Sequence, residues 1–163
     1  MIRALLVWVL AGLSGPAFAL SCLPHDVART FQQAAEAENA YIVVHGALQF
    51  DDTRLPKVDM ATQPQTPPET LIPAQITGKA LSHDGFTIGF DRKITLNVQC
   101  FGPWCAGATS GTYYLAFLEK RADGYRLSLT PCGGFGFGKP SKAMLDTVKA
   151  CFRGGPCAPA DLR

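Results

Sequence analysis

The segment Lys93-Ile-Thr-Leu-Asn-Val-Gln-Cys100 decides the fold class, because apolar and polar residues alternate along it. Ile94, Leu96 and Val98 project to one side of an extended chain, and the residues between them project to the other side. A period of two is typical of a β-strand that has one buried and one solvated face. This segment therefore predicts one strand of a sheet that covers a core.

Segments on both sides of this strand are also rich in β-branched and aromatic residues, and turn-forming residues separate them. Ser82-His-Asp-Gly85 and Asp91-Arg92 separate the strands before it, and Asp123-Gly124 predicts a hairpin turn after it. We expect strands at residues 41–50, 75–81, 85–90, 93–100, 112–119 and 125–130. Five or six antiparallel strands in this order are most simply a small closed or partly closed β-barrel, which makes the chain mainly β.

Two segments near the ends of the chain are predicted to be short amphipathic helices. Residues 26–38 begin with Asp26, a good N-cap, and place apolar residues on one stripe. Residues 141–152 place Leu145 and Val148 on one stripe as well. We expect these N-terminal and C-terminal helices to pack on the sheet.

The composition fits one domain, since 47% of the 163 residues are hydrophobic and 17% are charged. The formal net charge of +2 is too small to indicate a nucleic-acid partner. Residues 51–73 differ from the rest, because they contain five prolines and few large apolar residues. We expect a single disulfide-stapled domain over residues 20–163, with a long Pro-rich loop at 51–73.

Residues 1–19 have the layout of a secretory signal peptide, with a cation at Arg3, an apolar stretch and small residues at the end. The apolar stretch is about half of the roughly 20 residues that a membrane span needs, which argues against an integral span. Cleavage after Ala19 and cleavage after Ser21 both satisfy the small-residue rule. A lipid anchor on Cys22 is a weaker option, because Ala19 stands where the lipoprotein box has Leu. The sequence predicts a secreted or periplasmic protein.

An even number of cysteines beyond an export signal argues for disulfides. Fifteen pairings of the six cysteines are formally possible. The preferred one closes two short loops and joins the N-terminus to the late part of the domain, with the pairs Cys22–Cys132, Cys100–Cys105 and Cys151–Cys157. Alternatively, Cys100-Phe-Gly-Pro-Trp-Cys105 is a thiol-disulfide redox centre, although such centres have two residues between the cysteines at a helix N-terminus.

Four short segments together resemble the netrin-module and TIMP-like (tissue inhibitor of metalloproteinases-like) superfamily, as a bacterial-type exported member. They are Ser21-Cys22, the strand at 38–47, Gly111-Thr-Tyr-Tyr-Leu-Ala-Phe-Leu118 and Leu127-Ser-Leu-Thr-Pro-Cys132. The resemblance covers most of residues 22–152 and implies an OB-like barrel. In the inhibitors of this superfamily, a free N-terminal Cys binds the zinc of the target protease, which here requires a chain that begins at Cys22. The Cys-x-Cys start of the animal inhibitors is missing, since Leu23-Pro24 follows Cys22.

No catalytic, metal or cofactor motif is found in the sequence. It contains neither His-Glu-x-x-His nor Gly-x-Ser-x-Gly. His45 has no second ligand or carboxylate at a diagnostic spacing. Gly134-Phe-Gly-Phe-Gly138 lacks the lysine and hydroxyl of a nucleotide loop, so we expect a flexible turn with two aromatic anchors. We therefore expect no cofactor and no catalytic residue.

Binding remains as the predicted function. Aromatic residues in or beside loops are candidates for a surface that meets an envelope or extracellular protein, and alternatively they cap the ends of the core. The candidate binding surface consists of Cys22, Phe101, Trp104, Tyr113, Phe135 and Phe137. We expect an exported, non-enzymatic binding protein, in one form a protease inhibitor. The alternatives are a thiol-disulfide oxidoreductase that uses Cys100 and Cys105, or a structural envelope protein.

Overall fold

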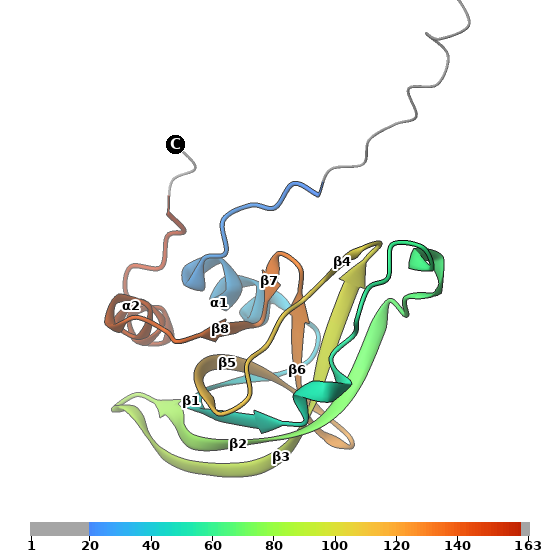
Figure 1. Ribbon diagram of the computed structural model, residues 1–163. Helices are drawn as coiled ribbons and strands as arrows, with labels where there is room; N and C mark the ends of the chain where they lie inside the picture. Colours follow the sequence, from blue (N-terminus) through green and yellow to red (C-terminus); the bar gives the residue numbers. More distant parts are fainter. Residues whose placement is uncertain (1–19, 161–163) are drawn as a thin grey trace, which may run out of the picture.

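Five long strands close into a ring in the computed structural model, which describes residues 20–160 (Figure 1). Their bounds are β1 Tyr41–Phe50, β2 Glu69–Ser82, β3 Gly85–Phe101, β5 Thr112–Arg121 and β6 Gly124–Thr130. The strands follow one another in the order β3-β2-β1-β5-β6, and β6 pairs back onto β3. The expected signal peptide at residues 1–19 lies outside the described residues.

The pairing that closes the ring is parallel. It joins β3 to β6 from Thr95 opposite Arg126 to Val98 opposite Leu129, whereas the pairs around the rest of the ring are antiparallel. The mainly β fold class with a short helix near each end is thus confirmed, and the β3–β6 pair is the one departure from the expected antiparallel arrangement among the described strands. Because β5 runs between β3 and β6 in the sequence, β6 can return alongside β3 in the same direction.

Three short strands complete the sheet. β4 Trp104–Cys105 folds back on the end of β3, β7 Gly133–Gly134 pairs with β6, and β8 Gly136–Gly138 pairs with β5. The segment expected to be a flexible turn is therefore mostly strand. Its two phenylalanines do act as anchors, since Phe135 and Phe137 both pack against buried apolar residues.

β3 is one continuous strand of 17 residues, not two strands divided at Asp91-Arg92. The carboxylate of Asp91 accepts hydrogen bonds from the side chains of Gln75 (2.6 Å) and Thr77 (3.0 Å) on β2. These bonds lower the pKa of Asp91 below its ordinary value and fit the acid onto the solvated face of the sheet. A polar pair in the sequence therefore does not interrupt the strand.

β2 begins at Glu69, so the loop covers residues 51–68 instead of 51–73. The loop contains two short 3-10 turns, Asp52–Arg54 and Gln63–Gln65. Pro73 is a strand residue opposite Thr95 of β3. The pairing of β2 with β1 begins at Ala74, which is opposite Phe50, so Pro73 has a strand neighbour on one side only. Proline has no backbone N–H, and a position without a second neighbouring strand can accommodate it.

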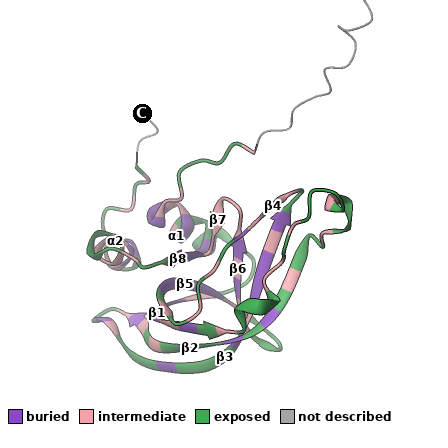
Figure 2. Cartoon of the chain, in the orientation of Figure 1, coloured by how far each residue is buried: buried purple, intermediate pink, exposed green. Residues whose placement is uncertain are grey.

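The inside of the ring holds the larger core. Leu48, Ile72, Ile76, Leu96 and Leu127 are fully buried there. The alternation at 93–100 is confirmed, since Ile94, Leu96 and Val98 belong to this core. Figure 2 shows the buried residues concentrated on β5, β6 and the ring end of β3.

A second core lies between the ring and the two helices, α1 Val27–Glu36 and α2 Lys142–Phe152. Val27, Val43, Phe117 and Val148 meet there, and the two helices contact each other. Both N-caps are in place, because Asp26 accepts from Arg29 N–H and Ser141 accepts from Met144 N–H. Within residues 20–160, no helix is long and apolar enough to cross a membrane.

Three disulfides fasten the N-terminal segment, one hairpin and the segment after α2. Cys22 is bonded to Cys132, Cys100 to Cys105 and Cys151 to Cys157, which is the pairing preferred from the sequence. The first joins the N-terminal segment to the residues after β6, with a sequence separation of 110. The third closes the chain just after α2.

Candidate binding groove

A groove of about 810 Å³ lies where the β2–β3 hairpin extends past the beginning of β1. The end of α1 and residues 37–40 form one wall, and the hairpin forms the other. The groove exists because β1 first pairs with β2 at Val44, opposite Ala80. Residues 41–43 therefore have β5 as their only strand neighbour in the described chain.

The floor of the groove is apolar. Ile42, Ala80, Ile88, Phe90 and Tyr125 line it. Ile88 is 57% exposed, although it is a large aliphatic residue in the middle of a strand. Phe90 packs against Tyr125, with ring centroids 5.4 Å apart in an edge-on arrangement. An exposed aliphatic side chain beside one buried and one partly buried aromatic ring is a suitable contact for an apolar ligand group.

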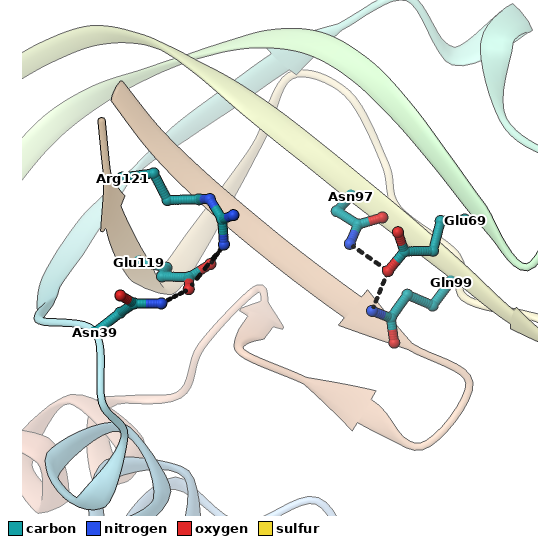
Figure 3. Close-up of polar contacts among 6 residues, drawn as sticks. All are labelled: Asn39, Glu69, Asn97, Gln99, Glu119 and Arg121. Carbon is teal, nitrogen blue, oxygen red and sulfur yellow. Dashed lines mark hydrogen bonds and ion pairs between the residues drawn. The ribbon is translucent and has the colours of Figure 1, made fainter. Parts of the chain in front are cut away.

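Polar groups surround one end of this floor. Asn39 lines the groove and donates a hydrogen bond of 2.6 Å to the carboxylate of Glu119, which is also 3.1 Å from the guanidinium of Arg121 (Figure 3). The neighbouring Tyr41 is partly buried, and this burial raises its pKa, with a further increase from the negative charge of Glu119. The Tyr41 phenol therefore remains a neutral hydrogen-bonding group at the groove wall.

Arg92 is the cation that lines the groove. Its guanidinium donates to the carbonyl of the adjacent Asp91 (3.1 Å), and no ion pair joins it to a carboxylate of the described residues. Glu38 is the acid of the lining and has no ion pair within residues 20–160 either. The groove thus offers apolar contact together with charged groups that are available to a ligand.

The candidate surface predicted from the sequence is divided between separate places. Phe101 and Trp104 are cross-strand neighbours at the β3–β4 turn and are 43% and 39% exposed. The turn between them is next to the Pro-rich loop, since a Cβ at Gly102 would be 3.5 Å from the Gln63 side chain. These two aromatics form a small exposed pair that the groove does not include.

The other aromatic residues of that prediction have different roles. Tyr113 is 57% exposed and lies 5.4 Å from His45, centroid to centroid. His45 is a partly covered ring, and this burial lowers its pKa below the ordinary value. Phe135 stacks on Tyr41 behind the groove wall. Phe137 is only 4% exposed, so it belongs to the second core and not to a binding surface.

Cys22 is exposed, but its sulfur is bonded to Cys132. A sulfur atom in a disulfide cannot carry the thioether of a lipid anchor. The depression around Cys22, about 350 Å³, is lined by the N-terminal segment, α1 and Phe135. Cys22 is thus separate from Phe101, Trp104 and Tyr113, none of which lines this depression.

A second polar cluster occupies the outer face of β2 and β3. Glu69 accepts hydrogen bonds from the side-chain amides of Asn97 (3.2 Å) and Gln99 (3.1 Å), as Figure 3 shows. Asn97 is 2% exposed and Gln99 is partly covered. These bonds connect the two strands across the sheet, which is a structural role.

The Cys100–Cys105 disulfide joins a strand to its hairpin partner, and Cys100 is 5% exposed. It lacks the position at a helix N-terminus that lowers the pKa of a catalytic thiol. Among residues 20–160, no group of three or more His, Cys, Asp or Glu side chains is placed to hold a metal ion.

The groove was not predicted from the sequence. Its one sequence signal is the position of Ile88 and Phe90 on alternate sites of a strand with Arg92 two residues further, which puts the three on one face. Which segment that face meets depends on the path of residues 37–43, far away in the sequence. No protein-family model, curated protein or solved structure matches this chain.

Proposed function

We propose that this chain is an exported binding protein, acting without catalysis, that holds an apolar segment of an envelope or extracellular protein in the groove between the end of α1 and the β2–β3 hairpin. The observation that carries the proposal is Ile88, 57% exposed on the floor of an apolar groove. A groove of about 810 Å³ falls within the range of roughly 300–1,000 Å³ that is usual for ligand sites.

The lining favours a protein segment over a small polar ligand. Its floor is aliphatic and aromatic, while charges lie at the sides, at Arg92 and Glu38. Side chains of a partner protein can fill such a floor, and its backbone and polar groups can meet the sides. Three disulfides support the view that the protein works in an oxidising compartment such as the periplasm or the extracellular space.

The superfamily resemblance adds a narrower version of this proposal. A TIMP-like protease inhibitor needs a free amino group on Cys22, so the mature chain would have to begin there. Intact mass and N-terminal mapping of the exported protein, before and after reduction, test this version. A start at Leu20 contradicts the inhibitor mechanism and leaves binding in the groove untouched.

Selection from a random peptide display library tests the groove itself. The immobilised protein is expected to enrich peptides with apolar side chains, and Ile88→Asp is expected to abolish their binding. Leu71→Asp is the matched control, because Leu71 is also an exposed aliphatic strand residue (48%) but lies outside the groove. Enriched peptides that bind Ile88→Asp as well as the unchanged protein contradict the proposal.

A further inference from the structure

β3 has a long free edge beside the groove. From Gly85 to Gln99 it pairs with β2 on one side. On its other side β6 covers only residues 95–98, and β4 covers only Cys100 and Phe101. Within residues 20–160, the stretch from Gly85 to Ile94 therefore has no strand on its second side. Figure 1 shows this stretch as the outer margin of the hairpin that extends beyond the ring.

The groove reaches the backbone of this edge. Ile88, Gly89 and Phe90 all line it, although successive side chains of a strand point to opposite faces. Gly89 has no side chain to block an approach, and a Cβ built there would meet no atom within 4 Å. In an antiparallel ladder every second residue turns its N–H and C=O away from its partner strand. The free side of β3 thus presents unpaired hydrogen-bonding groups next to an apolar floor.

We propose that the partner segment binds by β-strand addition: an extended acidic-apolar peptide pairs with the free edge of β3 between Thr87 and Lys93. Alternate side chains of the added strand cover Ile88 and Phe90, and a carboxylate of the peptide pairs with Arg92. The backbone hydrogen bonds supply affinity and the groove selects the side chains, as in other strand-addition complexes. This inference rests on the proposed function, for which it names the binding mode and the partner chemistry.

The charges of the edge favour an acidic partner. Arg92 and Lys93 are exposed, and neither forms an ion pair within the described chain. The adjacent acid, Asp91, is already held by Gln75 and Thr77 of β2. Arg92 shares the groove face with Ile88 and Phe90, so a carboxylate that follows apolar side chains on the added strand can reach it.

A second copy of this chain is a poorer occupant. Two copies of residues 85–94 that overlap fully in an antiparallel pair would place Arg92 opposite Thr87 and Asp91 opposite Ile88. No cation would meet an acid, and a carboxylate would lie against the exposed aliphatic residue. An acidic segment from another protein removes both mismatches.

Three synthetic peptides test the mode of binding: Thr-Val-Thr-Val-Thr-Glu-Thr, whose Val and Glu side chains share one face of a strand, the same peptide with Lys in place of Glu, and the Glu peptide with alternate backbone amides N-methylated. Binding is followed by NMR titration of the isotope-labelled protein, with disulfides intact. We expect the Glu peptide to shift and protect the amides of residues 87–93. N-methylation is expected to abolish binding, because it removes backbone donors and leaves the side chains unchanged.

Charge reversal at Arg92 supplies the second readout. Lys in place of Glu is expected to weaken binding about tenfold, and Arg92→Glu is expected to reverse that preference. Lys79→Glu is the matched control, since Lys79 is an exposed cation of the same hairpin outside the groove lining. The reversal has to appear in Arg92→Glu and not in Lys79→Glu.

The outcomes separate this inference from the proposed function. Equal binding of the Glu peptide and its N-methylated form, with sensitivity to Ile88→Asp, overturns strand addition and leaves the groove as the binding site. If Ile88→Asp binds both of these peptides as tightly as the unchanged protein does, the groove is overturned as the binding site as well. Absence of binding by all three peptides, or a dimer in sedimentation that Arg92→Glu disrupts, also overturns the proposed mode.

Discussion

His25 lies flat against Phe137, with ring centroids 3.8 Å apart and an angle of 7° between the ring planes. Its Nε2 atom donates a hydrogen bond of 2.9 Å to the carbonyl oxygen of Gly134. Because a carbonyl only accepts, the proton is on Nε2. The contact requires glycine at position 133, where a Cβ would be 2.3 Å from the imidazole and φ is +111°. The N-terminal segment is thus held to β7 and β8 by the His25 imidazole, and the Cys22–Cys132 disulfide holds it just before β7.

We expect His25→Ala to lower the free energy of unfolding by about 1–2 kcal/mol, because it removes a stacked contact and a hydrogen bond. The control is His83→Ala, since His83 is an exposed residue of the β2–β3 turn whose ring meets the exposed Phe152 only in a tilted surface contact, with centroids 5.4 Å apart. The control should change stability by less than about 0.5 kcal/mol. Chemical denaturation of the three proteins checks the prediction, which is wrong if the two variants lose the same amount.

Stability should depend on pH through the same ring. Burial lowers the pKa of His25 below its ordinary value of 6.5, and this effect outweighs the increases from the Gly134 hydrogen bond and from Asp26. The unfolded chain therefore takes up the proton more readily than the folded one. The contribution of His25 is complete above about pH 6.5 and is lost as the pH falls through its folded-state pKa.

Urea unfolding from about pH 7.5 to about pH 5.5 measures this effect. The unchanged protein should lose stability over that interval, and His25→Gln should lose less. His45, whose pKa is also lowered by burial, contributes in the same direction, so His25→Gln should retain part of the pH dependence. An unchanged slope in His25→Gln contradicts the assignment.

Gly78→Ala should be strongly destabilising, by about 3 kcal/mol. Gly78 is opposite Gly46, where β1 and β2 approach closely, and a Cβ on it would be 2.2 Å from the carbonyl oxygen of His45. Gly89→Ala is the control in the adjacent strand, with nothing within 4 Å of the added atom. It should change stability by no more than about 0.5 kcal/mol. Thermal unfolding of both variants tests whether the close approach, or glycine in a strand as such, determines the cost.

The disulfides should contribute unequally. Replacing Cys22 and Cys132 by Ser together should cost about 4–5 kcal/mol in the loop-entropy description, because their sequence separation is 110. The same replacement at Cys100 and Cys105, with a separation of 5, should cost about 2 kcal/mol. Guanidinium unfolding of the two double variants measures the difference, and equal losses would show that chain entropy does not dominate.

Local patterns predicted the elements that have clear periodicity or caps. The expected strand at 41–50 coincides with β1, and Asp26 is the N-cap of α1. The predicted Asp-Gly hairpin connects β5 to β6. These features depend on nearby residues, which a sequence displays directly.

The parts that the sequence did not predict depend on long-range pairing. A period of two shows that Val98 faces a core, but it does not show that Val98 pairs in parallel with Leu129. Asp91 suggested a break in the strand, because a sequence does not show that Gln75 and Thr77 on β2 satisfy its carboxylate. The groove follows from the separation of β1 and β2 before Val44, and it brings Ile88 close to residues 37–43, over 40 positions away. The candidate site was therefore missed, while most of the strands were found.

The paired strands β1 and β5 contribute residues to both cores. Val43 and Phe117 face the helices, whereas Val44 and Ala116 face the inside of the ring. The helices therefore cannot detach without uncovering strands on which the ring core depends, so the molecule should open as one cooperative unit. In hydrogen–deuterium exchange, the amides of residues 114–118 should be the slowest. Those on the free edge of β3 should exchange without waiting for global opening, so that the surface available to a partner strand is also the most dynamic part of the sheet.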